Sequence, residues 1–386
     1  MARKWISVPA LLALMVLAVS PLVEGSHADA RADRPQIVAS FSILADVAQN
    51  VAGDAADVTS LIPFGGDPHS YSPSARDVAA LSDADAVLAV GINFEESLLP
   101  VIQEAASDQL VIVSACVPVR AIEAGMGAHE DDHADEATAE AHLADQGAVS
   151  DAVAQACAQH TSEVAAAFGV DDAALSEGAI GPLYALECPG DAHDEAEAGA
   201  DDEAHEHAAG SCDPHVWTDP ANAALWALSV RDTLSSLDPA NAETYAANAD
   251  AYLSELAALD GDVRDQIATI PKDRRLIVTN HLTLSYYAHR YGLELAGVVI
   301  PGGGTAAEPS VQEVLDLVST VQDYGVPAIF TETTVNPSLA QQVADETGAQ
   351  IVPLYTDSLS EPDGDAGTYL DYIRYDTRMF VEALGQ

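Results

Sequence analysis

Short apolar runs alternate with longer segments of helical periodicity along most of this chain, in one series that starts near Gln36 and another that starts after residue 270. Alternation of strands and helices predicts an α/β fold with mostly parallel sheets covered by helices. The expected helices include Ser74–Leu81 and Phe94–Ala105. The expected strands are Ile37–Phe41, Val58–Ile62, Ala86–Gly91, Leu110–Ser114, Leu276–Thr279, Leu295–Ile300, Pro327–Thr331 and Ile351–Leu354.

A long helical segment separates the two series. Asp238-Pro239 supplies a helix start, because proline is favoured in the first turn, and the next proline is Pro271. Apolar residues recur three and four positions apart from Tyr245 to Ile270. We therefore expect one amphipathic helix over 238–270, about 45 Å long at 1.5 Å per residue, which acts as a rigid spacer between two lobes.

The pattern divides the chain into an N-terminal α/β lobe over 35–237, the linking helix over 238–270 and a C-terminal α/β lobe over 271–386. An acidic, His-rich insert at about 121–210 interrupts the first lobe. Its composition favours a solvated, disordered segment, and a weak, multi-site collector of divalent metal is a compatible function. The parts at 149–168 and 175–186 are more apolar and could form helices. Six histidines are scattered among its acidic runs: His129, His133, His142, His193, His205 and His207.

The first residues have the pattern of a secretory signal. Two basic residues precede an apolar run from Trp5 to Val19, and small residues follow at Ala28-Asp29-Ala30. The run is short for a membrane span, so we expect residues 1–30 to be a cleaved signal peptide rather than an anchor. No cysteine precedes Cys116, which leaves no thiol near the cleavage site for a lipid. We expect the mature protein to be soluble and periplasmic.

Charge and cysteine content narrow the possibilities. With 14 Lys and Arg against 62 Asp and Glu, the formal net charge is −48, which argues against nucleic acid or anionic lipid as a partner. The four cysteines of an exported protein predict two disulfides. Cys116 with Cys157 and Cys188 with Cys212 would each close one acidic loop, and the nested pairing is nearly as plausible.

Four metal-binding side chains stand out. His69, His281 and Asp357 each follow an expected strand, and ligands of open α/β sheets bind beyond the carboxyl ends of strands. His215 precedes an expected helix, and its loop could fold over the same place. Asp-Pro directly precedes two of the histidines, His69 and His215, and proline restricts the backbone just before each imidazole. Three imidazoles and one carboxylate make a closed, four-coordinate site that favours zinc over manganese.

Glu332 and His289 have simpler explanations. Glu332 could cap the next helix, and His289 lies within an expected helix as a structural residue. The chain lacks Gly-x-Ser-x-Gly, a phosphate-binding Gly-x4-Gly-Lys and His-Glu-x-x-His. Two functions of other classes stay open. One is a secreted zinc hydrolase with Glu332 as general base, which requires Asp357 to lie away from the metal. The other is a passive zinc buffer that uses mainly the insert.

The motifs around these residues resemble the periplasmic zinc-binding proteins of ABC importers, the ZnuA-like group. The resemblance covers the chain outside the signal and the insert. The motifs are Gly66-Asp67-Pro68-His69-Ser70-Tyr71-Ser72-Pro73, Asp213-Pro214-His215-Val216-Trp217-Thr218-Asp219-Pro220, Thr279-Asn280-His281-Leu282 with Arg290-Tyr291-Gly292-Leu293, and Ile329-Phe330-Thr331-Glu332 with Tyr355-Thr356-Asp357-Ser358-Leu359.

The resemblance implies two α/β lobes joined by one long rigid helix, with the metal held between them. His69 and His215 would come from the first lobe, and His281 and Asp357 from the second. In manganese-type relatives the third metal ligand along the chain, here His281, is commonly Glu. The histidine at this position therefore indicates zinc. The implied function is a non-enzymatic, monomeric receptor that captures Zn²⁺ outside the cytoplasm and delivers it to an ABC permease. A manganese-specific protein of the same type is the alternative.

Overall fold

The structure is a computed structural model. It describes residues 34–95, 98–122, 151–182, 212–301, 304–305 and 307–385. The expected signal peptide and the six histidines named among the acidic runs of the insert lie outside these residues.

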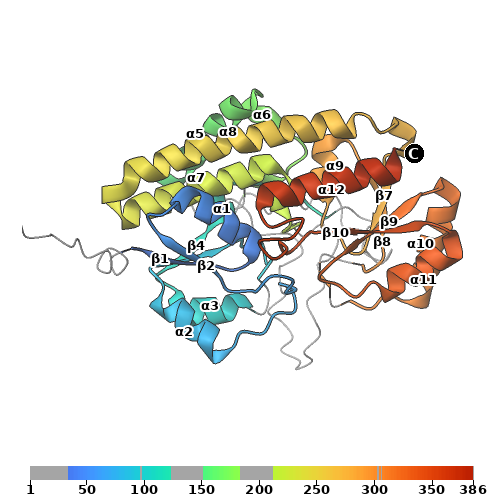
Figure 1. The fold of residues 1–386 in the computed structure, drawn as a ribbon, viewed down its shortest axis with the longest axis horizontal. Coiled ribbons are helices and arrows are strands. Elements are labelled where there is room, and N and C mark those ends of the chain that lie inside the picture. The colour runs from blue at the N-terminus through green and yellow to red at the C-terminus, as the bar shows by residue number, and fades with distance from the viewer. Residues whose placement is uncertain are drawn as a thin grey trace, which may run out of the picture. The chain divides into compact units, whose positions relative to one another are not determined.

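The first sheet has four parallel strands in the order β2-β1-β3-β4 (Figure 1). Its central strands are almost entirely buried, as expected for a parallel sheet with helices on both faces. One face carries α1 (Ser42–Ala52), and the other carries α2 (Ala75–Asp83) and α3 (Leu99–Ala106). The strands are β1 (Gln36–Ala39), β2 (Asp57–Ser60), β3 (Ala86–Ala89) and β4 (Leu110–Ile112).

The second sheet is also parallel, in the order β10-β9-β7-β8. Alternate residues of its strands face opposite sides. Val278 and Ile329 pack under α10 and α11, whereas Ile277 and Phe330 belong to the larger core on the side of α9 and α12. The elements are β7 (Leu276–Thr279), α9 (Ser285–Tyr291), β8 (Glu294–Val298), α10 (Val311–Tyr324), β9 (Ala328–Glu332), α11 (Ser338–Thr347), β10 (Gln350–Leu354) and α12 (Tyr369–Leu384).

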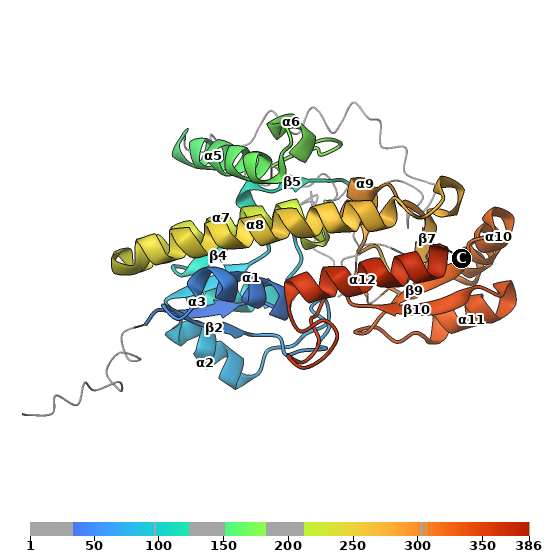
Figure 2. The ribbon, with the colours of Figure 1, turned by 45° about the horizontal axis from the view of Figure 1, so that its top comes forward.

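The expected linking helix is present as α8 (Ala242–Ile267), 26 residues and about 39 Å long, after a 3-10 turn at Pro239–Asn241. It packs against α1 and α7 (Pro220–Leu237) on the side of the first sheet and against α12 near the second (Figure 2). One hydrophobic cluster runs from the first sheet through this helix to the second. The helix therefore shares one packed core with both sheets. None of the helices in the described ranges is long and apolar enough to cross a bilayer.

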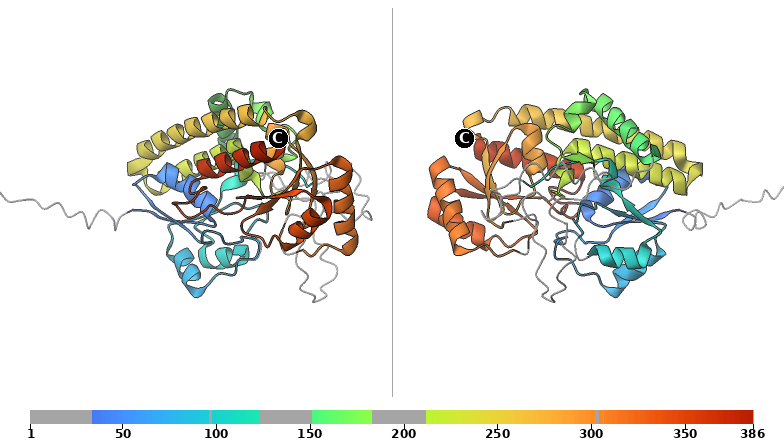
Figure 3. Two further views of the ribbon diagram at one scale, coloured as in Figure 1. Left: turned by 45° about the vertical axis from the view of Figure 1, so that its right-hand side comes forward. Right: turned by 180° about the vertical axis from the view of Figure 1, so that it is seen from behind.

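Part of the insert is folded: the helix considered for 149–168 is confirmed, and the expectation of disorder over all of 121–210 is corrected there. Residues Asp151–Phe168 form α5, which packs on α7 and α8, and Asp172–Leu175 form α6 (Figure 3). Val164 and Ala165 bury their side chains on the inner side of α5. This apolar face is diluted when composition is averaged over the whole insert.

A disulfide anchors this folded part. Cys116 is bonded to Cys157 of α5, which confirms one of the expected pairings. Cys212 is also disulfide-bonded, and Cys188 lies outside the described residues. The helix expected over 175–186 is wrong in its described part, where Gly181–Pro182 forms β6 and pairs with β5 (Pro118–Val119).

Candidate metal centre

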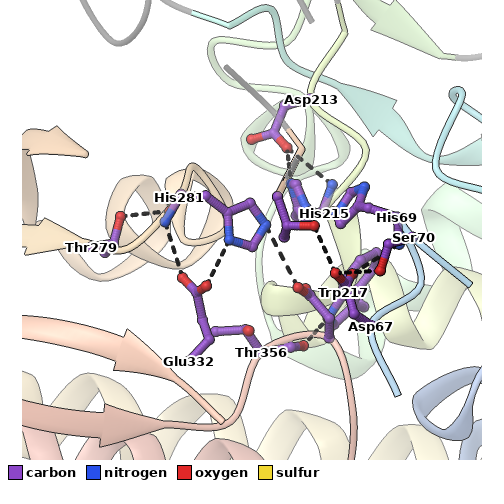
Figure 4. Close-up of polar contacts among 12 residues, drawn as sticks. Asp67, His69, Ser70, Asp213, His215, Trp217, Thr279, His281, Glu332 and Thr356 are labelled. Atoms are coloured by element: carbon purple, nitrogen blue, oxygen red, sulfur yellow. Dashed lines mark hydrogen bonds and ion pairs between the residues drawn. The ribbon is translucent and has the colours of Figure 1, made fainter. Parts of the chain in front are cut away.

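Four buried side chains from four separate loops meet beside the carboxyl ends of the two sheets. His69 follows β2, His281 follows β7, Asp357 follows β10, and His215 lies just before α7. One candidate ligand atom from each lies within 4.8 Å of the other three. Figure 4 shows the three imidazoles turned toward one another. Parallel strands bring these loops together because their carboxyl ends share one edge of each sheet.

The separations suit a small metal ion. His69 Nε2 lies 3.3 Å from His215 Nε2, and His281 Nε2 lies 3.6 Å from the Oδ2 atom of Asp357. The ring centroids of the three histidines are 5.2–5.4 Å apart. Ligand atoms about 2.0–2.1 Å from a tetrahedral zinc ion lie about 3.3 Å from each other. The observed spacing therefore leaves room for one such ion.

Asp213 sets the orientation of His215. Its Oδ1 atom accepts the backbone N–H of His215 at 3.0 Å and lies 2.8 Å from the ring Nδ1, while the hydroxyl of Ser285 donates to Oδ2. With Nδ1 held by a carboxylate, Nε2 faces the other ligands (Figure 4).

Burial and the carboxylate of Asp213 together decide whether His215 is charged. Burial lowers the pKa of His215 to about 3, although the hydrogen bond and charge of Asp213 act in the opposite direction. Burial alone would raise the pKa of Asp213, but the hydrogen bond and charge of His215 keep it below its usual value. Near pH 7 the imidazole is therefore neutral, which is the form that binds metal.

Glu332 orients His281 in the same way as Asp213 orients His215. Its carboxylate accepts the backbone N–H of His281 at 3.2 Å and lies 2.7 Å from Nδ1. The contact forms because β7 and β9 are neighbours in the sheet, which places both residues at adjacent strand ends. Burial lowers the pKa of His281, but the charge and hydrogen bond of Glu332, with the charge of Asp357, outweigh it and raise the pKa to about 9.

Three atoms of the cluster have no hydrogen-bond partner among the described residues. His281 Nε2 and both carboxylate oxygens of Asp357 are buried without a hydrogen bond, and burial raises the pKa of Asp357 to about 6. Buried polar atoms are almost always paired, so such a group needs an explanation. Histidine nitrogen and carboxylate oxygen are both zinc ligands, and a cation between them would satisfy all three atoms.

The structure corrects the two roles considered for Glu332. The next helix, α11, begins at Ser338, so Glu332 does not cap it. The carboxylate is bound to His281 instead of being available as a general base. His289, expected to be structural, lies in α9 and is not part of the cluster.

Sequence reasoning missed the supporting role of Asp213. A signal was present, because Asp stands two residues before His in both Asp-Pro-His motifs and can accept the N–H two residues on. That local pattern does not show whether the carboxylate also reaches the ring.

Comparisons with known proteins identify the family of this chain. Residues 37–383 match the family described as "Zinc-uptake complex component A periplasmic". The chain is 27% identical over 352 residues to the manganese-binding lipoprotein MntA of Halalkalibacterium halodurans. The aligned residues cover 91% of this chain and 89% of the relative. It is also 27% identical over 375 residues to the iron-binding protein YfeA of Yersinia pestis, with 96% and 93% covered.

Two solved structures share the fold. One is the manganese-bound periplasmic metal binding protein from Candidatus Liberibacter asiaticus, with a TM-score of 0.63, 24% identity, and 91% of this chain and 100% of that chain covered. The other is the periplasmic zinc binding protein TroA from Treponema pallidum, with a TM-score of 0.64, 21% identity, and coverage of 92% and 100%. Their names and those of the sequence relatives include three different metals. The chain belongs to the ZnuA family, the periplasmic metal-binding solute-binding proteins of metal ABC importers.

Proposed function

We propose that this protein captures Zn²⁺ outside the cytoplasm with His69, His215, His281 and Asp357 and delivers it to the permease of an ABC importer. The observation that carries the proposal is a set of buried atoms without a hydrogen bond, His281 Nε2 and both Asp357 oxygens, inside a cluster of three histidines. The family is non-enzymatic, so a receptor role fits and the hydrolase alternative does not.

The donor set favours zinc. Three imidazole nitrogens and one carboxylate oxygen suit a tetrahedral zinc ion, whereas manganese prefers a larger share of oxygen ligands. All four positions around the ion would be filled by protein. Such a closed site holds and releases its ion and leaves no position for an activated water.

Charge favours a dication in this place. Asp357 is buried in the cluster, and the carboxylates of Asp213 and Glu332 stand directly behind two of the histidines. A concentration of buried negative charge is costly unless it is paired. In the absence of metal, a proton on His281 offsets part of it, as the raised pKa of that imidazole indicates. When Zn²⁺ binds, it displaces this proton and so replaces one positive charge with two.

A competition titration tests the assignment. Purified chain, stripped of metal and free of an affinity tag, is titrated with Zn²⁺ in the presence and absence of excess Mn²⁺. We expect one tightly bound zinc that manganese does not displace. His281→Ala should lose this binding, while the matched variant His289→Ala, which removes a histidine of α9 outside the cluster, should keep it. Tight binding that survives His281→Ala would instead assign the metal to the insert, as in the buffer hypothesis.

Manganese is the second candidate, because relatives at 26–27% identity carry manganese in their names. The same titration decides between them. Equal affinity for both ions, or a preference for manganese, would reject the zinc assignment. His281→Glu supplies an internal check, because an added oxygen ligand should shift the preference toward manganese if His281 sets it.

A further inference from the structure

A hydrogen bond near the cluster joins the two lobes through residues that are not candidate ligands. The hydroxyl of Thr305, between β8 and α10, donates to Asp67 Oδ2 at 2.7 Å. Asp67 lies in the loop that carries His69, and its Oδ1 atom accepts the backbone N–H of His69 at 3.0 Å. The bond therefore ties a loop of the second lobe directly to the first ligand loop.

This bond lies beside the candidate ligand that contacts solvent. Among the four candidate ligands, His69 is 5% exposed and the other three are fully buried. His69 is therefore the candidate ligand that an ion from solvent would meet first. Both Asp67 and Thr305 are only half-buried, and Figure 4 shows Asp67 beside His69 and Ser70.

Two other contacts between the lobes are more deeply buried. Trp217 donates its indole N–H to the carbonyl of Thr356 at 2.9 Å, and the hydroxyls of Ser42 and Ser358 are 3.3 Å apart. All four of these residues are buried, whereas the Asp67–Thr305 bond is accessible to water. Hydrogen bonds close to solvent and outside a packed core open most readily.

We propose that the Asp67–Thr305 hydrogen bond controls how fast metal enters and leaves the site, with Thr305 as a positioning residue that holds the His69 loop against the second lobe. The inference rests on the proposed four-ligand site and adds a kinetic role to it. Neither side chain is a candidate ligand, so the bond does not depend on the ion, and it must open for passage in either direction. Its loss should therefore accelerate binding and release together.

Thr305→Val tests this, because it removes the hydroxyl and keeps the shape of the side chain. Association of Zn²⁺ with the metal-free chain and its release to excess chelator are followed by stopped-flow. We expect both rate constants to rise about 3- to 10-fold, the range for loss of one ordinary hydrogen bond, with Kd changed less than about twofold. Thr305→Ser should restore the wild-type rates.

Ser70→Ala is the matched control. Ser70 donates to the same oxygen, Asp67 Oδ2, at 2.9 Å, but from within the same loop, so its loss should leave both rates unchanged. Unchanged rates in Thr305→Val, a rise in the release rate alone, or equal effects of the two variants would overturn the inference. A wild-type chain that prefers Mn²⁺ would reject the zinc proposal separately, and the same rate measurements with Mn²⁺ would still test this bond.

Discussion

Asp67-Pro68-His69 and Asp213-Pro214-His215 have the same three residues and the same local turn. In each, the aspartate Oδ1 atom accepts the histidine backbone N–H at 3.0 Å. Beyond the turn they differ. Asp213 is buried and reaches the imidazole of its own histidine, whereas the Oδ2 atom of the half-buried Asp67 accepts the hydroxyls of Ser70 and Thr305. One motif orients a candidate ligand, and the other bonds to Thr305 between β8 and α10.

The first way to test this comparison is to remove the imidazoles. His215→Ala and His69→Ala should each weaken zinc binding more than about 100-fold, beyond the loss typical of residues behind the ligands, because each removes a ligand. Chelator competition measures the affinity, and circular dichroism checks the fold. A loss under tenfold in either variant would mean that its motif does not supply a ligand.

The second test separates the aspartates. Asp213→Asn should weaken zinc binding about 10- to 100-fold, because the charge behind His215 Nδ1 is lost. Asp67→Asn should have a smaller effect, since its described bonds go to a backbone N–H and to hydroxyls. Equal losses in the two variants would show that the motifs act alike.

The third test uses pH. His281, with its pKa raised to about 9, holds a proton below that pH which the metal must displace, so zinc affinity should fall about tenfold per pH unit from 9 toward 6. Asp357 steepens the fall below its pKa of about 6. His215, with a pKa of about 3, should contribute nothing in this range.

Calorimetry in buffers of different ionisation enthalpy should count about one proton released per zinc at pH 7.5. Glu332→Gln is the matched variant, because it removes the charge that raises the pKa of His281 and should flatten the profile. An affinity independent of pH in the wild type would contradict the assigned role of His281.

The smallest expected difference is in stability without metal. Asp213→Ala leaves a buried ring nitrogen of His215 and the hydroxyl of Ser285 without this acceptor, so the free energy of unfolding should fall by about 1–3 kcal/mol. Asp67→Ala, in a half-buried loop, should cost about 1 kcal/mol. Urea denaturation in chelator measures both, and the reverse order would contradict the burial argument.

Much of the architecture could be read from the chain. The strand expected at 276–279 matches β7, and α8 lies within the expected 238–270, because apolar periodicity and proline positions report local structure directly. The four candidate ligands came from two Asp-Pro-His motifs and from strand ends. The apolar stretch at 149–168 indicated the helix that became α5, and its disulfide to Cys116 was one of several possible pairings.

The sequence by itself determined the alternation of strands and helices, the long helix and the residue types that can bind a metal, since these depend on neighbours along the chain. Only the tertiary structure decided that Asp213 and Glu332 stand behind their histidines, that both oxygens of Asp357 lack a hydrogen bond, and that Thr305 bonds Asp67. The last contact spans 238 positions along the chain, so the packing of the two lobes around α8, and no local pattern, sets it.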